Sequence, residues 1–399
     1  MEQTNGIEPG ARYGPAKIVT DAPAQGSRAG GAGMAEEMPR VRLTQRQAVG
    51  VVVFVLSSVA FLYFALPKLA GLEATAHRIE RGDGWWIAIG VLLEILSFGG
   101  YVVLFQSVFV REPGPIGWRE SYEITMAGLA ATRLFATAGA GGVALTAWAL
   151  RRSGMEPRLV ACRMVAFLVV LYVIYAGSVL VDGLGLATGL FPGGGSLAIT
   201  LVPAVVAAVL LAAVGAMAML PGDVERRLAR WASGSGRFAH WVARAVTVPA
   251  LAASGVRTAI ELIRSRDVGL LGAIAWWGFD ISVLWAMFHA FGSPPPFTVI
   301  VMAYFLGMLG NLLPLPGGLG GVEGGMIGAF VAFGVNFNLA VLAVLSYRAI
   351  SFWLPTLPGA LAYIQLRRKV ARWRATQSAY PSVAPLAEPV EPTGALQAR

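Results

Sequence analysis

The chain has 399 residues, of which 56% are hydrophobic and only 13% are charged, and its mean hydropathy is +0.65. This composition is too apolar for a soluble domain and places the chain among integral membrane proteins. The formal net charge of +9 does not indicate a nucleic-acid partner, because the excess Lys and Arg residues lie in connections beside apolar segments, where they orient helices and meet anionic headgroups.

The chain begins with a hydrophilic segment, which is followed by an uncharged apolar one. Residues 1–45 are rich in Gly, Ala and Pro and poor in aromatic side chains, so we expect a disordered cytoplasmic tail that buries too little surface to fold. Residues 47–66 carry no charge, and about 20 residues at about 1.5 Å each match the roughly 30 Å apolar core of a bilayer. This segment is predicted to be the first span. We expect it to be retained, because no small-residue cleavage site follows it.

Six further apolar segments follow along the chain. They are 85–110, 162–181, 196–220, 268–291, 298–313 and 338–364. With two weaker segments, they predict an all-α polytopic membrane protein of about seven to nine membrane segments. Its transmembrane domain, 46–366, comprises two halves, 85–220 and 268–366, joined by a basic amphipathic cytoplasmic connection, 221–267. The chain then ends in a basic and finally disordered cytoplasmic tail, 367–399.

Basic residues indicate which connections face the cytoplasm, because Lys and Arg accumulate on that side of a membrane protein. Arg residues precede the first span, recur through 221–267 and follow the last span, whereas 183–195 and 292–297 contain neither Lys nor Arg. We therefore place both termini in the cytoplasm and the chain in the inner membrane of the cell. Aromatic residues among the arginines of 221–267 suit helices that lie on the anionic leaflet.

The two weaker segments are predicted to be re-entrant hairpins. Because the residues on both sides of 121–150 face the cytoplasm, this stretch crosses the membrane an even number of times. Its arms, 121–134 and 139–150, are each shorter than the roughly 20 residues that a crossing needs, and Arg133 lies near the tip. A second hairpin over 298–335, followed by one full span, takes the chain from the outside back to the cytoplasm.

Both hairpins carry a similar glycine-rich sequence near the turn, AGAGGV at 138–143 and GGLGGV at 317–322. Since the hairpins enter from opposite sides, the pattern is that of an inverted repeat, whose broken helices meet near the midplane at the substrate site. The candidate backbone contacts are Gly141, Gly142, Gly317, Gly318, Gly320 and Gly321. The alternative is that these glycines are small residues that let helices pack closely.

Two carboxylates interrupt the apolar segments, Glu94 in VLLEILSF and Asp280 in WWGFDISVL. A charge at the bilayer centre costs about 2.5–3.5 kcal/mol even on the most lenient scale, so such residues face a cavity or a partner, or are protonated. They occupy loosely corresponding places in the two halves. Headgroup binding and proton coupling are the functional interpretations. A protonated carboxyl group, hydrogen-bonded between helices, is the structural one.

Three further charges are candidates for a headgroup site. Glu323 lies in the second hairpin and Arg348 in the last span, so they can pair with each other, and an Arg side chain also suits a lipid phosphate, which its planar guanidinium binds bidentately. Arg133 is a second anion-binding candidate. The alternatives are a structural salt bridge between Arg348 and Glu323, and an Arg133 side chain that reaches back to the cytoplasmic interface.

Several kinds of chemistry have no support in the sequence. A single cysteine, Cys162, excludes an intrachain disulfide, and the three histidines are too scattered for a metal site. No GxxxxGK[ST] loop is present, so direct use of ATP is disfavoured, and no GxSxG or metal-binding motif supports an enzyme. We expect neither a cofactor nor a metal.

The most specific sequence is PLPGGLGGVEGGMIGAFVAFGV at 314–335, followed by 339–363, which contains LSYRAISFWLPTLPG. These residues, and AGAGGVALTAWALRRSG at 138–154, resemble the transmembrane region of lysylphosphatidylglycerol synthases, the flippase-like family of multiple peptide resistance factors. The resemblance covers about 47–366. It implies an α-helical lipid translocase fold with re-entrant helices and an aminoacylated, anionic or polyprenyl-type lipid as the partner.

The resemblance does not extend to an aminoacyltransferase, because the chain ends about 35 residues after the last span. Our leading hypothesis is therefore a stand-alone lipid flippase or lipid-binding transporter that moves a phospholipid or isoprenoid-type lipid between leaflets and is not itself an enzyme. Two alternatives stay open. One is an intramembrane enzyme that acts on lipid-linked substrates, and the other is a non-transporting membrane partner of a lipid-pathway enzyme.

Overall fold

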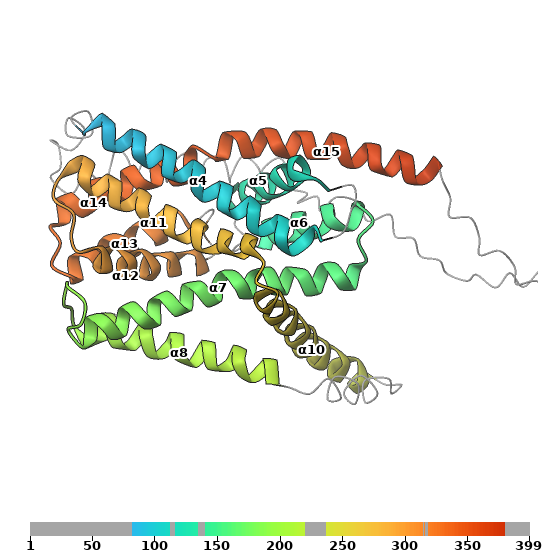
Figure 1. The fold of residues 1–399 in the computed structure, drawn as a ribbon, viewed down its shortest axis with the longest axis horizontal. Coiled ribbons are helices and arrows are strands. Elements are labelled where there is room, and N and C mark those ends of the chain that lie inside the picture. Colours follow the sequence, from blue (N-terminus) through green and yellow to red (C-terminus); the bar gives the residue numbers. More distant parts are fainter. Residues whose placement is uncertain are drawn as a thin grey trace, which may run out of the picture. The chain divides into compact units, whose positions relative to one another are not determined.

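The computed structural model describes residues 82–111, 116–134, 140–219, 237–313, 315 and 318–379. They belong to one compact unit, 38–399, and their regular elements are all helices (Figure 1). The prediction of an all-α protein is therefore confirmed for the described part of the chain. The predicted tail 1–45 and first span 47–66 lie outside the described residues.

Within the described residues, five helical segments are long and apolar enough to cross a membrane, which makes the chain a multi-pass membrane protein. Four of them are α4 (Gly84–Phe109), α7 (Pro157–Ala187), α8 (Leu197–Met219) and α11 (Leu271–Phe291), the last extended at its start by a 3₁₀ turn from Val268. The fifth runs through α14 (Phe337–Arg348), a π-helical segment (Ala349–Trp353) and α15 (Thr356–Ala379). These helices coincide with five of the segments predicted as spans.

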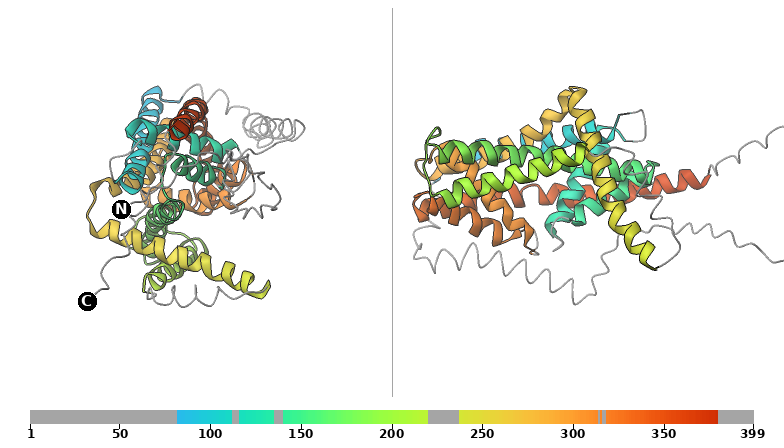
Figure 2. Two further views of the ribbon diagram at one scale, coloured as in Figure 1. Left: turned by 90° about the vertical axis from the view of Figure 1, so that its right-hand side faces the viewer. Right: turned by 90° about the horizontal axis from the view of Figure 1, so that it is seen from below.

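Shorter helices form two pairs where the hairpins are predicted. The first pair is α5 (Trp118–Leu134) and α6 (Ala140–Arg152), and the second is α12 (Phe297–Met308) and α13 (Gly321–Ala332). Even the 17 residues of α5 reach only about 26 Å, less than the roughly 30 Å that a crossing requires. Figures 1 and 2 show the two pairs in opposite halves of the bundle. This placement agrees with hairpins that enter from opposite sides. Their re-entrant nature and the inverted repeat stay predictions.

Helices α4 and α11 run antiparallel in close contact. Asp83 N–H, beside the start of α4, donates to Ala290 O near the end of α11 at 3.1 Å. A Cβ atom on Gly100 would lie 2.9 Å from Gly272 O, and one on Gly272 would overlap Gly100 O. Only small residues allow two backbones to approach so closely. The middles of the two helices, which carry the intramembrane carboxylates, therefore face each other.

The buried apolar side chains form two separate cores, one around each short helix pair. One core joins α12 and α13 to α11 and α14, and includes Phe288 and Phe330. The other joins α5 and α6 to α4, α7 and α15, and includes Leu104, Ile124 and Leu150. Each hairpin therefore packs into a core of its own.

Helix α10 (Arg237–Arg264) lies within the connection that we predicted to be amphipathic, 221–267. Its buried apolar side chains include Ala253, Val256, Ala259 and Leu262, which recur every third residue and so lie along one side of the helix. A Cβ atom on Gly255 of this face would overlap Val165 of α7, so the two helices are in close contact. α10 runs at an angle to the spanning helices (Figures 1 and 2). The predicted helix is present, and its contact with a lipid leaflet stays a prediction.

Candidate functional site

Five buried or partly buried charged residues from five helices interact in the interior. They are Glu94 of α4, Arg133 of α5, Asp280 of α11, Glu323 of α13 and Arg348 of α14, and we call them the central charge cluster. Arg133 ends one short helix, Glu323 begins another and Arg348 ends a third. The structure thus brings together all five charged residues that sequence reasoning singled out, although they are spread over some 250 positions of the chain.

Glu94 and Asp280 are in direct contact across the α4–α11 pair. Their side chains are 2% and 6% exposed, and the two carboxyl groups interact with each other. Two cations, Arg133 and Arg348, lie close enough to attract the Glu94 carboxylate. Antiparallel packing brings the middles of the two helices, and with them these carboxylates, side by side; their correspondence in an inverted repeat stays a prediction.

Two tyrosine hydroxyl groups hold Asp280 in place. Tyr347 of α14 donates to Asp280 Oδ2 at 2.9 Å, and Tyr304 of α12 donates to the same oxygen. Both tyrosines are fully buried, and a buried hydroxyl group requires a hydrogen-bond partner. Sequence reasoning missed both residues. Tyr347 adjoins Arg348 in the most specific motif of the chain, which was the one available signal, whereas Tyr304 stands in an apolar segment without any pattern.

Arg348 and Glu323 form the ion pair that the structural interpretation anticipated. Arg348 Nε lies 2.7 Å from Glu323 Oε1, and Gly320 N–H donates to Glu323 Oε2 at 2.7 Å. The carboxylate therefore caps the first turn of α13 with one oxygen and pairs with α14 through the other. A ligand that takes either donor has to displace Glu323.

Arg133 points into the cluster rather than toward bulk water. Its Nη1 donates to Phe352 O at 3.1 Å, and the guanidinium carbon Cζ lies over the rings of Phe98 and Phe352, 5.5 Å from each centroid. Glu94 is the carboxylate that attracts it most strongly. Arg133 is only partly buried, whereas the other four members of the cluster are 2–7% exposed. It is thus the more accessible of the two cations.

The π-helical segment that follows Arg348 supplies the acceptor for Arg133. Pro355, just beyond it, has no N–H to donate to a carbonyl one turn earlier. Phe352 O accepts from Arg133 Nη1 and from Thr356 Oγ1, the latter at 2.5 Å. The Ser351 hydroxyl group is buried and makes no hydrogen bond within the described part of the chain. Single π-helical turns of this kind are frequent at functional sites.

The glycines of the first hairpin serve close packing. A Cβ atom on Gly142 would overlap Thr132 Oγ1 and lie 2.5 Å from Gly128 O on the facing helix α5. Gly141 stands beside it in the first turn of α6. The packing interpretation therefore accounts for Gly142, and a role in ligand binding stays a prediction.

The glycines of the second hairpin shape the turn before α13. Gly318 and Gly320 have φ values of +66° and +83°, which side-chain-bearing residues rarely adopt. A Cβ atom on Gly321 would lie 3.0 Å from Gly310 O, so the turn also packs tightly on itself. Gly317 lies outside the described residues.

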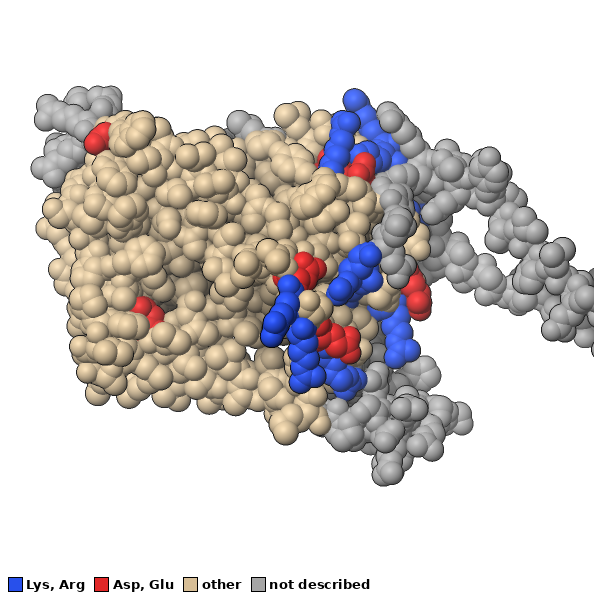
Figure 3. Space-filling model, viewed as in Figure 1, with Lys and Arg blue, Asp and Glu red and all other residues tan. Residues whose placement is uncertain are grey.

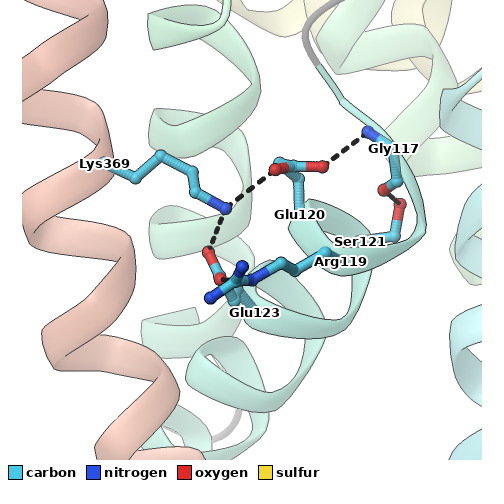
Figure 4. A network of polar contacts seen from close by, with 6 residues as sticks. All are labelled: Gly117, Arg119, Glu120, Ser121, Glu123 and Lys369. Carbon is cyan, nitrogen blue, oxygen red and sulfur yellow. Dashed lines mark hydrogen bonds and ion pairs between the residues drawn. The ribbon is translucent and has the colours of Figure 1, made fainter.

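A second polar network connects α5 to α15 near the basic end of the bundle (Figure 4). Lys369 Nζ lies 2.8 Å from Glu120 Oε1 and 2.8 Å from Glu123 Oε2, while Gly117 N–H donates to Glu120 Oε2 at 2.8 Å. Desolvation raises the pKa of Glu120, but the hydrogen bonds from Lys369 and Gly117 outweigh it, and the pKa is lowered overall. Sequence reasoning did not identify this network.

Lys and Arg side chains gather at one end of the bundle, the end at which α10 lies, on the face shown in Figure 3. Among the described residues, the opposite half of this face shows isolated acidic side chains and no basic ones. The charge asymmetry that we inferred along the sequence is thus also an asymmetry in space.

The chain matches a family model described as the lysylphosphatidylglycerol synthase transmembrane region over residues 47–359. It is 33% identical over 147 residues to a UPF0104 membrane protein of Methanothermobacter thermautotrophicus, covering 36% of this chain and 42% of that protein. Another such protein of this organism is 40% identical over 116 residues, which are 27% and 34% of the two chains. A UPF0104 membrane protein of Pyrococcus horikoshii is 30% identical over 100 residues, 25% and 30% of the two chains. The chain thus spans less than half the length of each of these relatives.

Proposed function

Because the chain belongs to the lysylphosphatidylglycerol synthase transmembrane-region family, we propose that it is a flippase-like protein that moves a lipid between the two leaflets of its membrane. The lipid is a phospholipid or isoprenoid-type lipid with a phosphate in its headgroup. The central charge cluster is the single observation that carries this proposal. Charges buried inside a spanning bundle are costly and mark substrate or ion pathways.

The composition of the cluster supports a phosphate-bearing substrate. Its cations are both arginines, whose planar guanidinium groups bind phosphate oxygens bidentately. Arg133 donates to a backbone carbonyl and is partly exposed, so a headgroup phosphate can approach it without displacing Glu323 from Arg348. The cluster also lies where the ends of the short helices meet, and broken helices of this kind flank substrate sites in many transporters.

The orientation follows from the charge asymmetry. We propose that the basic end of the bundle faces the cytoplasm, that both termini lie there, and that the chain resides in the inner membrane of the cell. With α5–α6 at this end and α12–α13 at the other, a headgroup at the cluster is reached from each side through a different hairpin.

Leaflet exchange in liposomes tests the proposed function. The purified chain is reconstituted with fluorescent phosphatidylglycerol, phosphatidylethanolamine or a polyprenyl phosphate, and dithionite quenching reports the fraction of probe in the outer leaflet. Arg133→Gln is expected to slow exchange roughly 10- to 100-fold, because a hydrogen bond to a charged group contributes about 1.5–3 kcal/mol.

Arg119→Gln is the matched control on the same helix, since the Arg119 side chain is 78% exposed. It is expected to exchange lipid at the rate of the wild type. If the wild type exchanges none of the three lipids, the proposed function is refuted. If Arg133→Gln and Arg119→Gln exchange lipid at equal rates, Arg133 does not contact the lipid during transport.

A further inference from the structure

We propose that Glu94 and Arg133 form one linked site, in which a proton binds Glu94 together with a lipid phosphate on Arg133, so that lipid movement is coupled to proton movement. This inference rests on the proposed function and adds proton movement as the energy source of lipid transport.

The cluster contains one more carboxylate than guanidinium groups. Glu94, Asp280 and Glu323 face Arg133 and Arg348, which leaves one formal negative charge in excess in a region of low dielectric. Two carboxylates in direct contact share a proton readily, because both cannot be ionised there without a large cost. One proton makes the cluster neutral.

Hydrogen bonding points to Glu94 as the residue that takes this proton. Both oxygens of Glu323 accept from fixed donors, Gly320 N–H and Arg348 Nε. Asp280 Oδ2 accepts from two tyrosine hydroxyl groups. In contrast, Glu94 Oε2 is buried and makes no hydrogen bond to any described residue. Glu94 also contacts Asp280, which can accept the hydrogen bond of a protonated Glu94.

The charged groups that act on Glu94 within the described structure come from three neighbouring helices. They are Asp280 from α11, Arg133 from α5 and Arg348 from α14, with Tyr304 and Tyr347 bonded to Asp280. Of these, Arg348 is already paired with Glu323. Arg133 is therefore the cation whose attraction for an anion depends most on whether Glu94 is ionised.

Protonation of Glu94 changes what Arg133 attracts. While Glu94 is ionised, it is the strongest attraction on Arg133, and an incoming phosphate has to compete with it. Once Glu94 carries a proton, Asp280 is the remaining carboxylate that attracts the guanidinium, which also contacts Phe352 O and two aromatic faces. The protonated cluster is neutral, so binding of a singly charged phosphodiester gives it a net charge of −1. This is the net charge that the cluster has without proton and lipid. Proton and lipid thus enter together without a change in charge.

By linkage, each ligand strengthens the other by the same factor, which is typically about 5- to 150-fold. The test measures binding of dansyl-labelled phosphatidylglycerol to the full chain in phosphatidylcholine nanodiscs, by energy transfer from tryptophan, across a range of pH. Wild-type affinity is expected to rise as the pH falls. Glu94→Gln, which imitates the protonated residue, is expected to bind tightly at every pH, and Arg133→Gln weakly at every pH.

Arg119→Gln is expected to follow the wild type, since this side chain is exposed and outside the cluster. A wild-type affinity that does not change with pH would overturn the proposal, as would a Glu94→Gln variant that keeps the pH dependence. Excess inorganic phosphate is not expected to displace the probe. Displacement would show that the phosphate comes from water rather than from a lipid, and would overturn the coupling to lipid movement.

An infrared measurement keeps the proposal testable if a variant binds lipid poorly for structural reasons. The C=O band of a protonated carboxyl group should grow when phosphatidylglycerol is added to the wild type, and Glu94→Gln should lack this change. A band that does not respond to the lipid would overturn the linkage. If leaflet exchange occurs but does not depend on pH, the proton coupling is excluded and the proposed function stands. If lipid and proton binding are linked but no exchange occurs, the proposed translocation is excluded and the linked site stands.

Discussion

Arg348 and Glu323 form a buried ion pair between the end of α14 and the beginning of α13. Arg348 Nε lies 2.7 Å from Glu323 Oε1, and the two side chains are 8% and 2% exposed. Glu323 Oε2 at the same time accepts from Gly320 N–H. The pair therefore joins the second hairpin to the last spanning segment at the depth of the central charge cluster.

Removal of one partner of this pair should destabilise the protein strongly. Arg348→Met leaves the Glu323 carboxylate buried without its cation, and an uncompensated buried charge costs about 3–5 kcal/mol. Thermal unfolding in detergent, followed by circular dichroism, measures the effect. The double variant Arg348→Met/Glu323→Gln should recover part of the loss, because it removes both charges. Equal stability of Arg348→Met and the wild type would show that the pair is not formed.

Substitution of Gly142 should loosen the first hairpin. In Gly142→Ala the added Cβ meets Thr132 Oγ1 and the backbone of Gly128, and overpacking of this kind costs about 1–3 kcal/mol. Gly177→Ala is the matched control, because nothing lies within 4 Å of a Cβ atom at that helical position. Thermal melts of the two variants are compared. A control that melts as early as Gly142→Ala would contradict the packing role of Gly142.

Cysteine labelling tests the proposed orientation. The single native cysteine, Cys162, is first replaced by Ala, and Ser196→Cys or Ser265→Cys is then introduced at an exposed serine between helices. In intact cells a membrane-impermeant maleimide should label position 196. Position 265 should react only after permeabilisation, since it lies in the basic connection that we place in the cytoplasm. The reverse pattern would invert the topology.

The network around Lys369 should make stability depend on pH. Because the pKa of Glu120 is lowered in the folded protein, its contribution is present above the pKa of an unfolded glutamate and is lost as the pH falls through the folded value. The melting temperature of the wild type should thus fall on acidification. In Lys369→Met this fall should be smaller, whereas Arg368→Met, an exposed neighbour, should behave as the wild type. An identical pH response in Lys369→Met and the wild type would exclude the lysine as its cause.

The sequence by itself determined the class of the protein, the position of its helices and its most informative residues. Apolar length has to match the bilayer, so the spans at 85–110, 196–220 and 268–291 were recognisable without tertiary information. Charges in such segments are costly and rare, which is why Glu94, Asp280 and Arg348 stood out. The Gly-rich turns were recognised by repetition, but their spacing did not distinguish packing from ligand binding.

Only the tertiary structure decided which of these residues meet. The contact of Glu94 with Asp280 depends on the antiparallel register of α4 and α11, and the pairing of Lys369 with Glu120 joins residues 249 positions apart. Tyr304 was invisible in the sequence, because a tyrosine in an apolar helix has no signature until its hydroxyl group finds an acceptor. Helix formation in a membrane is a local consequence of composition, whereas the partner of each buried charge is set by packing between helices, which no single segment encodes.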